Sequence, residues 1–147
     1  MRSMKCLMVV LGLSVLFLVG ISVAPHNVAM AAEAQLVKIQ PVGEEGKVTG
    51  LYIDPQNLYV DKNTIVIWMN GVPEQEIQVV FEEGKACKDV TANPMGFKLD
   101  ASNCYVTSFV PYADTSSLQF PESGVFNYIV QTEGGKLRAK GKIEVRR

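Results

Sequence analysis

The chain has 147 residues, of which 48% are hydrophobic and 20% are charged, and its formal net charge is −1. That length accommodates a targeting segment and one domain, with no room for a second hydrophobic core. The composition argues against a disordered chain, and the lack of a basic excess argues against a nucleic-acid-binding protein.

The N-terminus has the pattern of a secretory signal. Arg2 and Lys5 precede an apolar run, and the small side chains of Ala29 and Ala31 lie after it, where signal peptidase would cut. The run approaches the length of a bilayer span, so an uncleaved membrane anchor is the alternative. Cys6 lies before the apolar run and therefore does not fit the lipid-modified cysteine of a lipoprotein signal.

We therefore expect a cleaved signal over residues 1–31 and one domain over residues 32–147. The protein would be periplasmic or secreted, without a stable membrane span after cleavage. Loss of Arg2 and Lys5 would leave 12 of the 14 basic residues against 15 acidic ones, a net charge of −3. His26 is the only histidine, so the mature domain would contain none. This argues against an enzyme and against most metal chemistry at neutral pH.

Two cysteines, Cys87 and Cys104, remain in the predicted domain. In an oxidising compartment, an even pair in a small domain predicts a disulfide. The alternative is a reactive or metal-binding thiol pair. Together with Met95, reduced Cys87 and Cys104 would offer a soft site for Cu(I).

Short runs rich in β-branched and aromatic residues recur along the domain, separated by Gly, Asn and Pro turns. No stretch after the signal keeps a helical period, so an antiparallel sandwich or barrel is expected. The predicted strands are Leu36–Gln40, Val48–Asp54, Leu58–Val60, Thr64–Trp68, Glu76–Phe81, Cys104–Val110, Ser116–Phe120, Val125–Gln131 and Leu137–Val145.

The segment Glu82–Asn103 is polar and rich in turn residues, and we expect an irregular excursion there. Among the strands, Ile65, Ile67 and Met69 share one face, as do Ile77, Val79 and Phe81. Glu74 and Glu76 would also share a face, either as a paired-carboxylate site or, as surface carboxylates usually are, as a solvated edge.

The order of several segments resembles the cupredoxins. An apolar strand ends in Trp68-Met69-Asn70, and Ile77–Phe81 is similar to the next strand of that family. Gly124–Val130 is similar to its penultimate strand and Lys140–Val145 to its closing strand. The resemblance covers about residues 53–145 and implies an all-β, Greek-key β-sandwich.

Cupredoxins hold a type 1 copper ion with two histidines, a cysteine and a weak axial methionine. The resemblance places the two histidines at Ile77 and Glu133, the cysteine at Val130 and the methionine at Ala139. Only Glu133 carries a metal-binding group, so the resemblance implies no type 1 copper site and no cofactor.

We expect a non-catalytic binding or interaction module of the cell envelope, with an envelope protein or a small ligand as its partner. The alternative is a copper-binding or electron-transfer protein that uses Cys87, Met95 and Cys104 as ligands. A sandwich scaffold hosts many functions, so the fold does not select the partner.

Overall fold

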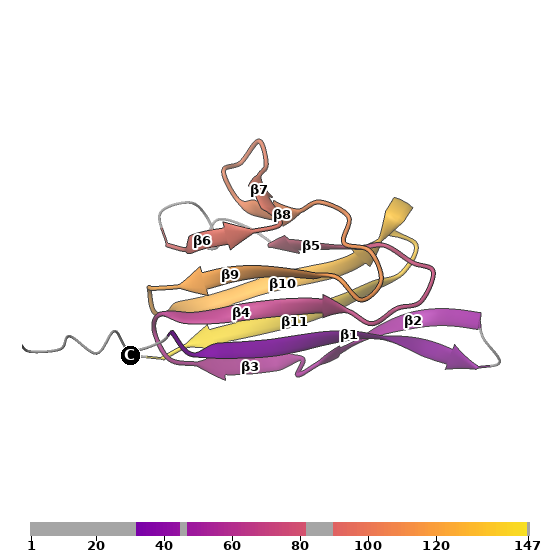
Figure 1. The fold of residues 1–147 in the computed structure, drawn as a ribbon, viewed down its shortest axis with the longest axis horizontal. Helices are drawn as coiled ribbons and strands as arrows, with labels where there is room; N and C mark the ends of the chain where they lie inside the picture. The colour runs from indigo at the N-terminus through magenta and orange to yellow at the C-terminus, as the bar shows by residue number, and fades with distance from the viewer. Residues whose placement is uncertain (1–31, 45–46, 82–89, 147) are drawn as a thin grey trace, which may run out of the picture. The chain divides into compact units, whose positions relative to one another are not determined.

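The structure, a computed structural model, describes residues 32–44, 47–81 and 90–146. The predicted signal over residues 1–31 and Cys87 lie outside this range. Within it, no helix is long and apolar enough to cross a membrane. Apart from one short 3-10 turn, the regular secondary structure of the described residues is all β-strand (Figure 1).

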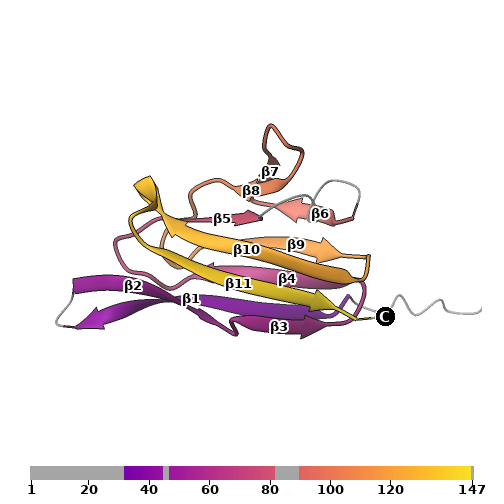
Figure 2. The ribbon, with the colours of Figure 1, turned by 180° about the vertical axis from the view of Figure 1, so that it is seen from behind.

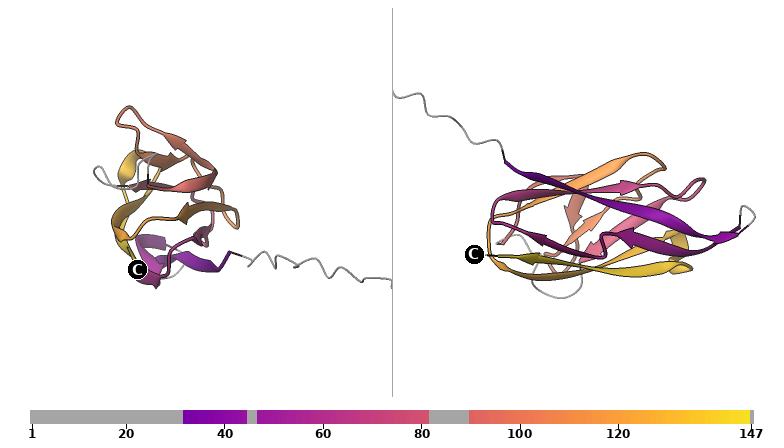
Figure 3. Two further views of the ribbon diagram at one scale, coloured as in Figure 1. Left: turned by 90° about the vertical axis from the view of Figure 1, so that its left-hand side faces the viewer. Right: turned by 90° about the horizontal axis from the view of Figure 1, so that it is seen from below.

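The strands form two sheets, which lie as facing layers (Figure 3). The first sheet has the order β2-β1-β4-β9-β6 and contains β1 (Ala34–Glu44), β2 (Lys47–Asp54), β4 (Thr64–Asn70), β6 (Ala92–Met95) and β9 (Thr115–Phe120). The second has the order β3-β11-β10-β5-β8-β7 and contains β3 (Asn57–Val60), β5 (Ile77–Phe81), β7 (Phe97–Leu99), β8 (Tyr105–Thr107), β10 (Gly124–Thr132) and β11 (Arg138–Val145).

The predicted all-β sandwich is confirmed, but its sheets are mixed rather than wholly antiparallel. β1 pairs with β4 in parallel, and β3 pairs with β11 in parallel. Both parallel pairs join strands that are distant in sequence, whereas the hairpins β1–β2 and β10–β11 are antiparallel. A local pattern of alternation identifies strands and does not report which distant strand lies beside them.

Segment 82–103 is where the strand prediction was wrong. Its described part contains β6 and β7, which we expected to be irregular. β6 includes Asn93, with φ of 49°, and Pro94, and its pairing with β9 has a register shift. Such residues are typical of turns and occur in strands mainly at sheet edges and bulges. The strand predicted over Cys104–Val110 is shorter, because β8 ends at Thr107 and Val110 forms an isolated bridge with Ile77.

Alternating side chains from both sheets form the core. Ile77, Val79 and Phe81 are buried on one face of β5, as the sequence predicts. In β4, however, Val66 and Trp68 face the core, and the face shared by Ile65, Ile67 and Met69 is only half-buried. β4 lies in the middle of its sheet with apolar residues on both faces, so alternation alone does not select the inner face.

Trp68 is the centre of an aromatic cluster. Its ring makes edge contacts with Phe81, Phe97 and Tyr128, at centroid distances of 5.8, 5.4 and 5.6 Å. Tyr128 is fully buried, and burial raises the pKa of its hydroxyl to about 12. The cluster joins both sheets, since Trp68 belongs to the first sheet and Phe81, Phe97 and Tyr128 to the second.

Gly141 provides the space for the Tyr128 ring. The two residues are directly opposite in the β10–β11 pairing, and a Cβ at Gly141 would lie 2.2 Å from Cζ of Tyr128. The ring of Tyr128 therefore packs onto the glycine backbone.

We predict that Gly141→Ala lowers the free energy of unfolding by about 1–3 kcal/mol, because the buried ring must move away from the new methyl group. Urea denaturation would measure the change. Gly50→Ala is the matched control: it also adds a methyl group to a strand, but its nearest neighbour, Cβ of Val42, lies at an ordinary 3.5 Å. Equal losses in the two variants would contradict the proposed packing of Tyr128.

Candidate functional site

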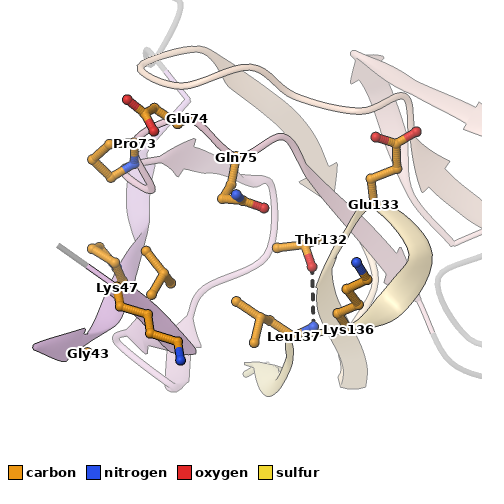
Figure 4. A pocket seen from close by; sticks show the side chains of 11 residues that line it. Gly43, Lys47, Pro73, Glu74, Gln75, Thr132, Glu133, Lys136 and Leu137 are labelled. Atoms are coloured by element: carbon orange, nitrogen blue, oxygen red, sulfur yellow. Dashed lines mark hydrogen bonds between the residues drawn. The ribbon is translucent and has the colours of Figure 1, made fainter.

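An open groove of about 890 Å³ lies at the end of the sandwich where β10 turns into β11. Three segments line it: the β1–β2 hairpin, the β4–β5 turn and the β10–β11 connection. Figure 4 shows Gln75 and Leu137 pointing into the opening, with Glu74 and Glu133 at the rim. The lining residues are Pro41, Gly43, Lys47, Val48, Pro73, Glu74, Gln75, Thr132, Glu133, Lys136 and Leu137.

Asn70 holds one wall of the groove in place. This fully buried residue ends β4, and its Nδ2 donates hydrogen bonds to the carbonyl oxygens of Gln75 and Val110, at 2.8 and 2.9 Å. Its Oδ1 accepts a hydrogen bond from the N–H of Val72, at 2.9 Å. One side chain thus satisfies three backbone groups around the β4–β5 turn.

The turn itself is tight. The N–H of Gln75 donates to the carbonyl of Val72, with Pro73 and Glu74 at the two central positions. Pro73 suits the first of these, whereas Glu74 has φ of 56°, a left-handed conformation that favours glycine or asparagine. A left-handed glutamate at a groove is a strained residue of the kind that gathers at functional sites.

Thr132 lies on the side of the groove opposite the β4–β5 turn. Its backbone N–H donates to the carbonyl of Leu137, and its Oγ1 accepts from the N–H of Leu137 at 3.2 Å (Figure 4). Between them lies the short 3-10 turn Glu133–Gly135, in which Gly134 and Gly135 both have positive φ. These glycines let the chain reverse within a few residues, which brings Glu133 and Lys136 to the rim.

The groove carries both signs of charge. The side chains of Lys47, Lys136, Glu74 and Glu133 form no ion pair or hydrogen bond with the part of the chain that the structure describes. Charged groups in this state are available to a ligand. The floor between them includes the half-buried apolar side chains of Val48 and Leu137, as ligand sites commonly do.

The four positions that match the copper ligands lie beside this groove. Val130 is paired directly with Ala139, and Ile77 is paired with Thr132 two residues further along β10. Ile77 and Val130 are buried, and Ala139 packs against the core. Glu133 is exposed at the groove rim. The structure therefore brings Ile77, Val130 and Ala139 together on three adjacent strands, and the residues there do not fit a copper ion.

Met95 and Cys104, two members of the alternative copper set, are not brought together. Met95 is exposed and lies beyond the Phe97–Thr107 pair of the β7–β8 hairpin. Cys104 is buried beyond the Leu99–Tyr105 pair, at the other end of that hairpin. Cys87 lies outside the described residues, so the disulfide with Cys104 stays a prediction.

Within residues 32–44, 47–81 and 90–146, no group of three or more His, Cys, Asp or Glu side chains is arranged to hold a metal ion. Glu74 and Glu76 were the candidate carboxylate pair. Glu74 lines the groove, whereas Glu76 does not.

Sequence reasoning missed most of the groove residues. Lys47, Gln75, Lys136 and Leu137 belong to no motif, and they meet only because the β1–β2, β4–β5 and β10–β11 connections lie at the same end of the domain. The available signals were the Pro73-Glu74 turn and the Gly134-Gly135 pair, which mark reversals of the chain but not their meeting point.

No protein-family model and no curated protein sequence matches the chain. Among solved structures, it is similar to the novel purple cupredoxin from Nitrosopumilus maritimus, with 17% identity over 76% of this chain and 98% of that protein and a TM-score of 0.47. It is also similar to amicyanin from Paracoccus versutus, with 17% identity over 80% of this chain and 86% of that protein and a TM-score of 0.45. Because these likenesses are distant, the β-sandwich assignment depends on the strand pairing.

We predict that Asn70→Ala lowers the free energy of unfolding by about 2–4 kcal/mol, because it removes a buried amide that makes three hydrogen bonds and takes from the buried N–H of Val72 its acceptor. Thermal or urea unfolding would measure the loss. Asn127→Ala, on an exposed position of β10, is the control and should change stability by less than about 0.5 kcal/mol. A loss at Asn70 no larger than that at Asn127 would show that the turn does not depend on the Asn70 amide.

Proposed function

We propose that the protein is an exported, cupredoxin-like domain without a type 1 copper site, which acts in the cell envelope as a non-catalytic binding module. Residues 1–31 would serve as the export signal, and the groove beside Thr132 would be the ligand site. The observation that carries the proposal is the arrangement at one end of the sandwich. Hydrocarbon occupies three of the four matching copper positions there, and charged groups that have no partner among the described residues line the adjacent groove.

The chemistry of Ile77, Val130 and Ala139 supports the loss of copper. A type 1 site requires imidazole and thiolate ligands that converge on one point, and these three side chains offer neither. Ile77 and Val130 are fully packed, so the space that a metal centre would need is taken by side chains. Electron transfer by a blue-copper protein depends on its cofactor, so side chains without copper ligands do not support that activity.

A binding role also agrees with the side chains available. Residues 32–147 contain no histidine, so a Ser-His-Asp or Cys-His arrangement is not possible in the predicted mature protein. The groove instead presents Lys47 and Lys136 as cations, Glu74 and Glu133 as anions and the Gln75 amide as a neutral hydrogen-bonding group. Such a lining matches a small ligand or chain terminus that carries both an ammonium and a carboxylate group.

The copper proposal is tested by adding Cu(II) to the native protein and to a variant with Ile77→His, Val130→Cys, Glu133→His and Ala139→Met. We expect no intense visible charge-transfer band in the native protein and such a band in the variant, because the substitutions supply the missing ligand set. The same variant with Val130 retained lacks the thiolate and is the matched control.

A charge-transfer band in the native protein would overturn the copper-free proposal. If the four-residue variant folds, as near-ultraviolet circular dichroism would show, but gives no band, then these positions do not correspond to copper ligands.

The groove is tested with glycylglycine, a small probe with one ammonium and one carboxylate group. In a titration followed by NMR, the amide signals of Gln75, Thr132 and Leu137 should shift in a saturable manner. Replacing both groove cations, Lys47→Gln with Lys136→Gln, should weaken binding about tenfold, since charge-assisted hydrogen bonds to the probe carboxylate are lost.

The matched control for this titration is Lys38→Gln with Lys62→Gln, which removes two exposed cations that do not line the groove. It should leave the glycylglycine affinity unchanged. Shifts that are absent, or that weaken equally in the two variants, would contradict the groove as the ligand site.

A further inference from the structure

Asn70 is followed by Gly71, and this is the only Asn-Gly pair in the sequence. In such a pair, the backbone nitrogen of the glycine can attack the asparagine side chain and close a cyclic imide. Glycine favours the reaction because it has no Cβ to hinder the nitrogen or to restrict the backbone. The pair is therefore a candidate site for deamidation, a spontaneous covalent modification.

The reaction needs water as its only co-reactant. The Gly71 nitrogen gives up its proton and bonds to Cγ of Asn70, the bond from Cγ to Nδ2 breaks, and Nδ2 leaves as ammonia with a proton from water. A water molecule then opens the imide. If it adds at Cγ, the product is aspartate. If it adds at the main-chain carbonyl, the backbone continues through Cγ and the product is isoaspartate.

The fold engages the nitrogen that would attack. The N–H of Gly71 donates to the carbonyl oxygen of Ile39 at 2.8 Å, so the proton that must leave is held in a hydrogen bond. The amide of Asn70 is fully buried, and its own hydrogen bonds keep it directed at the β4–β5 turn. Water and hydroxide therefore do not reach the Asn70 amide while the end of β4 stays enclosed.

The backbone of Asn70 is held as well. β4 lies between β1 and β9 in the first sheet (Figure 2). The N–H of Asn70 donates to the carbonyl of Asp114 at 3.0 Å, and its carbonyl accepts from the N–H of Ala113 at 2.8 Å. Closing the imide would rotate this main chain and break these bonds. The reaction therefore requires the end of β4 to open.

The same structure requires both residues of the reactive pair. A Cβ at Gly71 would lie 2.8 Å from the carbonyl oxygen of Ile39, so β1 approaches too closely for a side chain at this position. At Asn70, an amide is required because it supplies donors and an acceptor to one turn. The fold thus contains a reactive sequence that its own hydrogen bonds keep inert.

Deamidation removes the donor half of the Asn70 amide. An aspartate only accepts hydrogen bonds, whereas the carbonyl oxygens of Gln75 and Val110 lie 2.8 and 2.9 Å from Nδ2. A carboxylate there would be a buried charge facing two acceptors, which is strongly unfavourable. Isoaspartate would also insert Cβ into the main chain where β4 pairs with β1. Neither product fits the position that Asn70 occupies.

We infer that Asn70-Gly71 is a modification site that reacts only in opened or unfolded chains, and that either product prevents the chain from regaining this fold. Chains that stay unfolded are then lost permanently, while folded molecules are spared. Because Asn70 holds one wall of the groove, a modified chain would also lack the proposed ligand site. The inference itself depends on the hydrogen bonds around β4 and not on ligand binding.

The first test compares folded protein with protein unfolded in guanidinium chloride, both kept at mildly alkaline pH. Peptide mapping by mass spectrometry would follow the loss of Asn70, and an isoaspartyl methyltransferase assay would detect the rearranged product. We expect conversion to be at least about tenfold faster in the unfolded protein, because folded molecules open only rarely. Asn127, which is exposed and precedes Tyr128, is the control and should react slowly in both states.

The second test measures the effect on refolding. A partly deamidated sample is returned to native buffer, and folded molecules are separated from misfolded ones by size-exclusion chromatography. Chains modified at Asn70 should be depleted several-fold from the folded fraction, since the buried turn rejects a carboxylate. Chains modified at the exposed Asn127 should be divided evenly between the two fractions.

A variant separates the chemistry of the pair from its protection by the fold. Gly71→Ala, compared with the native sequence in guanidinium chloride, should slow conversion at Asn70 several-fold because the added Cβ hinders the nitrogen. Folding of the variant plays no part in this comparison.

Three results would overturn the inference. Equal conversion in folded and unfolded protein would show that the fold gives no protection, and an even division of chains modified at Asn70 would show that the product refolds. No preference for Asn70 over Asn127 in guanidinium chloride would show that the pair is not reactive. None of these measurements involves a ligand, so the glycylglycine titration succeeds or fails independently.

Discussion

The buried amide of Asn70 is the interaction on which the candidate site depends. It makes hydrogen bonds to backbone groups of Val72, Gln75 and Val110, and through them it joins the end of β4 to the β4–β5 turn and to the segment ahead of β9. The backbone of Asn70 also bonds to Ala113 and Asp114, ahead of β9. Because one side chain fixes the β4–β5 turn, Glu74 is held in a left-handed conformation that non-glycine residues adopt rarely.

The aromatic cluster around Trp68 holds the two sheets together in the core. Trp68 reaches across from the first sheet to Phe81, Phe97 and Tyr128 of the second, and Gly141 leaves room for the last of these. Dense packing of this kind leaves β10 and β11 little freedom to shift. The hairpin that they form is therefore a rigid support for the groove at its end.

The proposed ligand site depends in part on that hairpin. Its connection supplies Glu133, Lys136 and Leu137 to the groove. The inner face of the same strands carries Val130 and Ala139, where the resemblance to cupredoxins would place copper ligands. Val130 and Ala139 carry no metal-binding group, while the polar and charged positions of the hairpin are directed outward, where a partner can reach them.

The sequence by itself determined the all-β class, nine of the strands, the buried face of β5 and the apolar character of Ile77 and Val130. These features follow from alternation and residue type, which are local. Only the tertiary structure decided which strands pair in parallel, which face of β4 is buried, and that β6 and β7 exist despite Asn93 and Pro94. The groove likewise required the fold, because three connections far apart in sequence form it, and pairing between distant segments leaves no local pattern.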